Sequence, residues 1–250
     1  MVCDTLVHHP SLNKLVTFLE TVNGREKSLR LLQYLFSFIL SNKNLNLILN
    51  IKKNVLLYKN LQAQIGIVRK FLRFLKPISI LQSLIKLYNK RNGSLHIDFI
   101  LTFYKNLFNC LYLTFDQLNL LRILNVLPKN EFTVKRLPKI TNYFWLFGLV
   151  TSLLTSAKTI ITLNEKLIEL KNNNIEKQNE FEDEKIIQSL NIQKHQVLRK
   201  IVWDLLDSTV VVNSLDLIKL NQNGYASLAG VITSYFGIKE AWDKIPPSTK

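Results

Sequence analysis

The segment QIGIVRKFLRFLKPISILQSLIKLY (residues 64–88) joins five basic residues and no acidic residue to a run rich in Phe, Leu and Ile. At 100° per residue on a helical wheel, its first half has two opposite faces. Helices with such faces are typical of a membrane interface. A surface helix of a soluble bundle is the alternative, but 25 positions without an acid are unusual there. The predicted membrane-binding residues are Ile67, Val68, Arg69, Lys70, Phe71, Arg73, Phe74, Leu75 and Lys76.

Pro77 lies in the middle of this segment. Proline lacks a backbone donor and bends a helix, so we expect a kink there. Beyond Pro77, the polar stripe is rotated by about a third of a turn. The sequence thus predicts two half-helices: a lipid-facing wedge over 65–76, and a surface over 78–88 that docks on the rest of the protein.

The composition of the 250 residues favours helices throughout. Only seven glycines and six prolines are present, which is few for a sheet with many tight turns. A mean hydropathy of +0.09 accompanies a net charge of +15, an unusual pairing for a soluble chain. We therefore predict an all-α, membrane-associated protein with amphipathic helices and one or two transmembrane or membrane-embedded helices.

The positive charge is concentrated in the first two thirds of the chain. Up to residue 163 there are 22 Lys/Arg and 6 Asp/Glu, against 11 and 12 in the remainder. Such a basic region needs an anionic partner, either nucleic acid or anionic lipid. The basic residues alternate with apolar ones at helical spacing, and no zinc pattern accompanies them. We expect anionic membrane lipid as the partner, and no nucleic acid.

Two segments are candidates for membrane insertion. Residues 140–157 carry no charge over 18 positions, a length of ~27 Å as a helix, against ~30 Å for the hydrocarbon core. A buried core helix is the alternative. Residues 225–238 are short for a span, so they are predicted to be re-entrant, interfacial or extended upstream.

The sequence predicts three regions. They are a basic helical region over 1–163, a charged solvated linker over 164–196 that is partly helical at its ends, and C-terminal amphipathic and hydrophobic helices over 197–250.

Small residues recur every fourth position in the second candidate. Such spacing lets helices approach closely in lipid, where packing drives association. The pattern predicts a homo-oligomer that associates through two seams, Ala226, Gly230, Ser234 and Ala229, Thr233, Gly237.

No constellation for catalysis is visible. The four histidines are not spaced as metal ligands with Cys or acidic residues, and no phosphate-binding loop or nucleophile elbow is present. We therefore expect neither an enzyme nor a cofactor or metal site. Cys3 and Cys110 cannot form a disulfide framework, which favours a reducing compartment.

Several blocks of the sequence resemble one family, the peroxin-11 family of peroxisomal membrane proteins, and are closest to its budding-yeast members. The blocks include GREKSLRLLQYL (24–35), LQAQIGIVRKFLRFLKPISILQ (61–82), NYFWLFGL (142–149) and GYASLAGVITSYFGIKEAWDK (224–244). The resemblance implies a helical protein of the peroxisomal membrane that promotes proliferation. It further implies elongation of the organelle by an amphipathic helix, self-association, recruitment of the fission machinery and passage of small metabolites.

Two mechanisms are compatible with these patterns. In the first, the 64–88 helix inserts as a shallow wedge into the cytosolic leaflet, and oligomers concentrate the wedges into a tubule. In the second, the helices 95–126 and 140–163 line a pore for small metabolites, with the charges Asp98, Lys105, Asp116 and Arg122 facing water.

Overall fold

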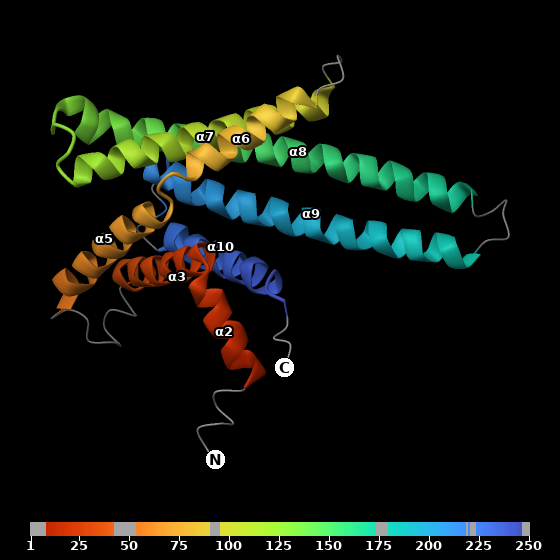
Figure 1. Ribbon diagram of the computed structural model, residues 1–250, viewed down its shortest axis with the longest axis horizontal. Coiled ribbons are helices and arrows are strands. Elements are labelled where there is room, and N and C mark those ends of the chain that lie inside the picture. The colour runs from red at the N-terminus through yellow and green to blue at the C-terminus, as the bar shows by residue number, and fades with distance from the viewer. Residues whose placement is uncertain are drawn as a thin grey trace.

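The computed structural model describes residues 9–42, 54–90, 96–173, 180–218, 220 and 224–246, and every regular element in these ranges is a helix (Figure 1). This confirms the all-α prediction. Cys3 and the middle of the segment 41–60 lie outside the described residues. The helices are α2 (Pro10–Glu20), α3 (Val22–Ser41), α5 (Val55–Leu72), α6 (Lys76–Asn89), α7 (Ile97–Ile123), the π-helical turn η2 (Phe132–Arg136), α8 (Leu137–Asn173), α9 (Glu180–Ser214) and α10 (Tyr225–Asp243).

The helices form two packed groups. In Figure 1, α6, α7, α8 and α9 run together in the upper half, and α8 and α9 extend beyond the others as a long pair. Below them, α10 packs on α3, and α3 packs on α5. Contacts of α10 with α9, and of α5 with α7, join the two groups. Segments far apart in sequence, such as α3 and α10, are therefore direct neighbours.

Helix boundaries follow local chemistry. The Thr21 hydroxyl accepts a hydrogen bond from the Gly24 amide at 2.9 Å and so caps the start of α3. The helix expected over 95–126 is α7. It ends just before Asn125, whose φ of +60° is tolerated better by Asn than by most residues, and Pro128 follows.

The predicted segment 140–157 lies within α8. In the described part of the chain, Phe132–Leu170 is the single helical stretch long and apolar enough to cross a membrane, and 22% of its most apolar 18-residue window is buried. The other candidate, 225–238, belongs to α10 and does not meet this test.

The segment 164–196 is more helical than its composition suggests. α8 continues to Asn173 and α9 begins at Glu180, and the residues between them lie outside the described ranges. The predicted linker begins at 164 and ends at 196, but α8 runs past the first boundary and α9 runs past the second.

Candidate functional site

The predicted amphipathic segment is two helices separated by a sharp turn. α5 ends at Leu72, α6 begins at Lys76, and Leu75 between them has a φ of +63° and a ψ of 0°. Pro77 is the second residue of α6, where its missing N–H has no partner to lose. The division lies two to five residues before the proline, and it is a break of the helix rather than a bend.

The basic face of α5 points into the protein. Arg69 Nη2 lies 2.8 Å from Glu26 Oε1 of α3, and its guanidinium also donates to Gln33. Lys70 forms an ion pair with Asp116 of α7. The wheel is right that these residues lie opposite the apolar ones, but they contact α3 and α7 instead of projecting outward.

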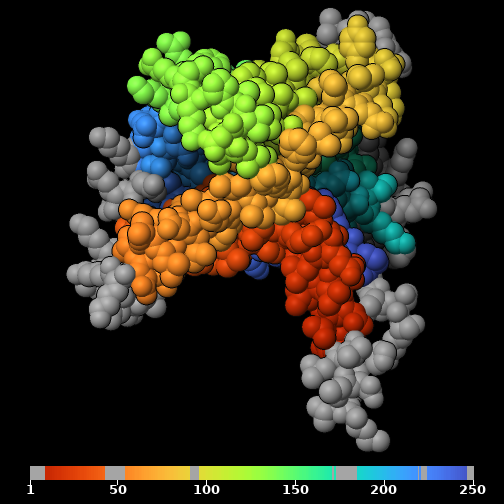
Figure 2. Space-filling model, turned by 60° about the vertical axis from the view of Figure 1, so that its left-hand side comes forward, coloured from red at the N-terminus to blue at the C-terminus, as the bar shows by residue number. Residues whose placement is uncertain are grey.

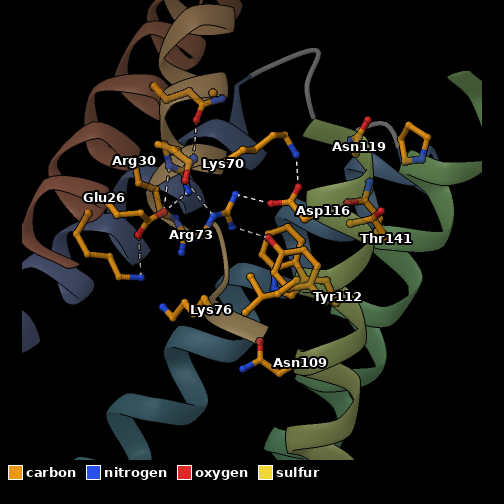
Figure 3. Close-up of a pocket in the computed structure, with 18 of the residues that line it drawn as sticks. Glu26, Arg30, Lys70, Arg73, Lys76, Asn109, Tyr112, Asp116, Asn119 and Thr141 are labelled. Atoms are coloured by element: carbon orange, nitrogen blue, oxygen red, sulfur yellow. Dashed lines mark hydrogen bonds and ion pairs between the residues drawn. The ribbon is translucent and has the colours of Figure 1, made fainter. Parts of the chain in front are cut away.

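Arg73 joins the same network from the turn between α5 and α6. Its Nη1 donates to the Tyr112 hydroxyl at 2.9 Å, and its Nη2 lies 2.9 Å from Asp116 Oδ2. Figure 3 shows Arg73 between the Glu26 side and the Asp116–Tyr112 side of this region. The turn is therefore held to α7 by charged hydrogen bonds, which are stronger than neutral ones.

The apolar side chains of α5 and α6 point away from the protein. Phe71 is 50% exposed and Ile78 is 63% exposed. Figure 2 shows α5 and α6 on the outer surface, between α3 and α7. The exposed residues recur every three or four positions across the break: Val68, Phe71, Phe74, Leu75, Ile78, Leu81, Ile85 and Tyr88. α6 docks on α7, with Leu84 as its buried residue, but its opposite face is exposed and apolar as well.

A second set of buried charges joins α3, α9 and α10. Arg30 forms an ion pair with Asp207, and its Nη2 donates to the Thr233 hydroxyl at 3.0 Å. Arg30 and Asp207 are both less than 9% exposed. Ser152 of α8 donates to Asp204 of α9 at 2.7 Å, and Lys200 pairs with the same carboxylate. Polar contacts thus connect most of the helices inside the protein.

A cavity of about 420 Å³ lies among these charges, between α3, α5, α6, α7 and α8 (Figure 3). Its charged lining residues are Glu26, Lys27, Arg30, Arg69, Lys70, Arg73, Lys76 and Asp116. The sequence singled out four of them as a basic lipid-binding face, and Asp116 as part of a pore. It missed Glu26, Lys27 and Arg30, although charges in an otherwise apolar helix signal a buried polar site.

Burial and charge change the ionisation of the α3 residues. Burial alone would raise the pKa of Glu26, but the charges of Lys27, Arg69 and Arg73 and the hydrogen bond from Arg69 lower it to about 2. Burial lowers the pKa of Lys27 to about 8, and the nearby Glu26 offsets only part of this effect. The cavity therefore holds a fully ionised carboxylate and a destabilised lysine ammonium.

The two small-residue seams of α10 are used inside the chain. Ala226, Ala229, Gly230, Thr233, Ser234 and Gly237 are all buried. A Cβ on Gly230 would lie 2.3 Å from Tyr34 Cδ1, and one on Gly237 would lie 2.9 Å from Lys27 Cδ. The seams thus let α3 approach α10 closely. In this structure they are not available for contact with a second copy.

The four charges predicted to line a pore do not share one path. Asp98 pairs with Lys158 at 2.6 Å, and its side chain is 74% exposed. Asp116 lies in the cavity with Lys70 and Arg73, whereas Arg122 donates to Asn119 and Lys105 lines a separate cavity. The pore is not favoured.

The molecule buries several charged groups and exposes many large apolar ones. Its buried ion pairs Arg30–Asp207, Arg69–Glu26 and Lys70–Asp116 join different helices. Large apolar side chains are exposed along α2, α5, α6 and α8. Water disfavours such a surface, and lipid does not. Together with the long apolar α8, this pattern defines a helical membrane protein.

The chain belongs to the peroxisomal biogenesis factor 11 (PEX11) family, whose model matches residues 12–242. It is 40% identical to the peroxisomal membrane protein PMP27 of Saccharomyces cerevisiae, over 97% of this chain and 99% of that protein. It is 34% and 32% identical to the peroxisomal membrane proteins PMP30B and PMP30A of Candida boidinii, over 97% of this chain and 98% of each. No solved structure matches the chain.

Membership confirms the family resemblance, the peroxisomal membrane location and a role in peroxisome proliferation. Biogenesis factors of this family are not enzymes by role. The peroxisomal membrane is therefore the membrane on which this protein acts.

Proposed function

We propose that this protein remodels the peroxisomal membrane by inserting the outer face of α5 and α6 into the cytosolic leaflet. The observation that carries the proposal is the exposed apolar stripe from Val68 to Tyr88, which continues across the helix break. A helix that buries such a stripe at the boundary of headgroups and acyl chains expands one leaflet. The ion pairs of Arg69, Lys70 and Arg73 hold the stripe rigidly to the bundle.

Anionic lipid is contacted by other basic residues than the sequence suggests. Lys59 of α5, Lys86 of α6 and Lys90, directly after α6, are exposed, and no ion pair joins them to any described residue. A basic group near an anionic leaflet contributes ~1 kcal/mol. We therefore assign the contact with anionic headgroups to these three lysines, and a structural role to Arg69, Lys70 and Arg73.

Tubulation of vesicles tests this assignment. The full chain is reconstituted into vesicles of phosphatidylcholine with phosphatidylserine, and tubules are counted by electron microscopy. We expect the triple variant Lys59→Gln, Lys86→Gln, Lys90→Gln to lose most tubulation and to keep its Tm. The control variant Lys166→Gln, Lys239→Gln, Lys244→Gln makes the same change in net charge elsewhere and should tubulate normally. Equal tubulation by both variants would rule out the lysine contact.

We also propose that copies of the chain associate and that the assembly recruits the fission machinery. Many wedges must gather to bend a membrane, and the family resemblance supports both roles. Because the α10 seams are buried, we place the contact between copies on another apolar face, that of α2, where Leu12, Leu15, Val16 and Leu19 are exposed. Disulfide cross-linking through a cysteine introduced at Leu15 tests this contact, and a matched cysteine at Lys244 should not cross-link.

A further inference from the structure

The cavity between α3, α5, α6, α7 and α8 carries more positive than negative charge. Six basic and two acidic side chains line it. Asp207, which pairs with Arg30 from α9, offsets one further positive charge. Among the described residues, an excess of three positive charges therefore remains around this partly open cavity. Such an excess is costly away from bulk water unless an anion balances it.

Several residues that line the cavity have donors without a full set of acceptors. Arg30 is 8% exposed, and its Nε has no hydrogen-bond partner among the described residues. Lys27 is paired with Glu26 at 3.5 Å, and that carboxylate also accepts from Arg69. Lys76 also lines the cavity and forms no ion pair within the described part of the chain. Half-buried Lys27 of α3 and exposed Lys76 of α6 thus line one space beside the buried Arg30.

The size and the donor chemistry favour a phosphate group. A water molecule takes up about 30 Å³ in the liquid, so 420 Å³ holds a phosphate with its attached group and some water. Arginine guanidinium groups match the oxygens of phosphate in geometry. A dianion would offset two of the three excess positive charges.

We propose that this cavity is a binding site for a phosphate monoester, contacted by Lys27, Arg30 and Lys76. The phosphate belongs either to a lipid headgroup or to a small soluble compound. The site differs from the outer lysines Lys59, Lys86 and Lys90, because it is recessed between helices and most of its lining residues are buried or half-buried. Arg69 and Arg73 form its wall and stay paired with Glu26 and Asp116.

Thermal unfolding of the full chain in a non-ionic detergent tests the site. The probes are inorganic phosphate, glycerol 3-phosphate and short-chain phosphatidylinositol 4-phosphate, with sodium chloride at equal ionic strength as the control. We expect a saturable rise in Tm of about 5 °C at a hundredfold excess over Kd for at least one phosphate probe. Saturation by the soluble probes identifies a soluble ligand, and saturation by the lipid alone identifies a headgroup. An equal rise in chloride would overturn the proposal.

The substitution Lys27→Gln separates binding from folding. Burial already lowers the pKa of Lys27, so removing its charge should leave the Tm of the free protein unchanged or higher. The same variant should bind the phosphate probe about tenfold more weakly. Lys76→Gln, on another helix, should weaken binding too, and Lys135→Gln, an exposed control, should not. If neither cavity variant weakens binding, the proposal is wrong.

Discussion

At the scale of single residues, the two aspartates of α7 have opposite environments. Asp116 is 5% exposed and pairs with Lys70 and Arg73, whereas the side chain of Asp98 is 74% exposed and pairs with Lys158. Removing one partner of a buried pair leaves an uncompensated charge, and an exposed pair contributes little.

We therefore expect Asp116→Asn to lower the free energy of unfolding by about 3 kcal/mol, and Asp98→Asn to lower it by less than about 1 kcal/mol. Unfolding of the purified protein in detergent measures both values. The two substitutions are chemically identical and lie on one helix. A difference between their effects on the free energy of unfolding therefore reports on the environment of each aspartate alone. Similar values for the two variants would mean that the interior network is not formed in the micelle.

At the scale of helices, the contact of α3 with α10 depends on a glycine. A methyl group at Gly230 would lie 2.3 Å from Tyr34 Cδ1, a distance at which the ring or the helix must move. We expect Gly230→Ala to lower the free energy of unfolding by about 1–3 kcal/mol because the contact becomes overpacked. The shift in Tm measures this cost.

Gly148→Ala in α8 is the matched control. Its added Cβ would lie 3.7 Å from Phe108 Cβ, an ordinary van der Waals contact, and alanine favours a helix over glycine. Its Tm should therefore stay the same or rise. If Gly230→Ala leaves the Tm unchanged but alters the oligomeric state, the α10 seam forms the contact between copies instead of the contact with α3.

The helices also show what the sequence can predict here. The period of apolar residues in 64–88 predicts two opposite faces correctly, because that depends only on local geometry. It does not predict which face is outside. The acids that draw Arg69 and Lys70 inward, Glu26 and Asp116, lie 43 and 46 residues away in sequence. For the same reason, the spacing in α10 predicts close helix packing but does not identify α3 as the partner.

At the scale of the whole molecule, the sequence does not predict which charged residues are buried and which apolar residues are exposed. Composition predicts a helical membrane protein, and the uncharged run 140–157 predicts the position of its longest apolar helix. The buried ion pairs depend on contacts between helices that are distant in sequence, such as Arg30 with Asp207. An interior of this kind fits a bundle whose outer surface is covered by acyl chains.

Leu154 of α8 tests whether the outer surface faces lipid. It is exposed, within the stretch long enough to span a membrane. In water, an exposed leucine is replaced by arginine at little cost, but at the centre of a membrane helix arginine costs about 2.5–3.5 kcal/mol. We expect Leu154→Arg to shift much of the protein from the carbonate-resistant membrane pellet to the supernatant. Leu154→Ala, which shortens the side chain without adding charge, should stay in the pellet. If both variants stay there, the outer face of α8 is not in contact with lipid, and α8 must be covered by protein instead.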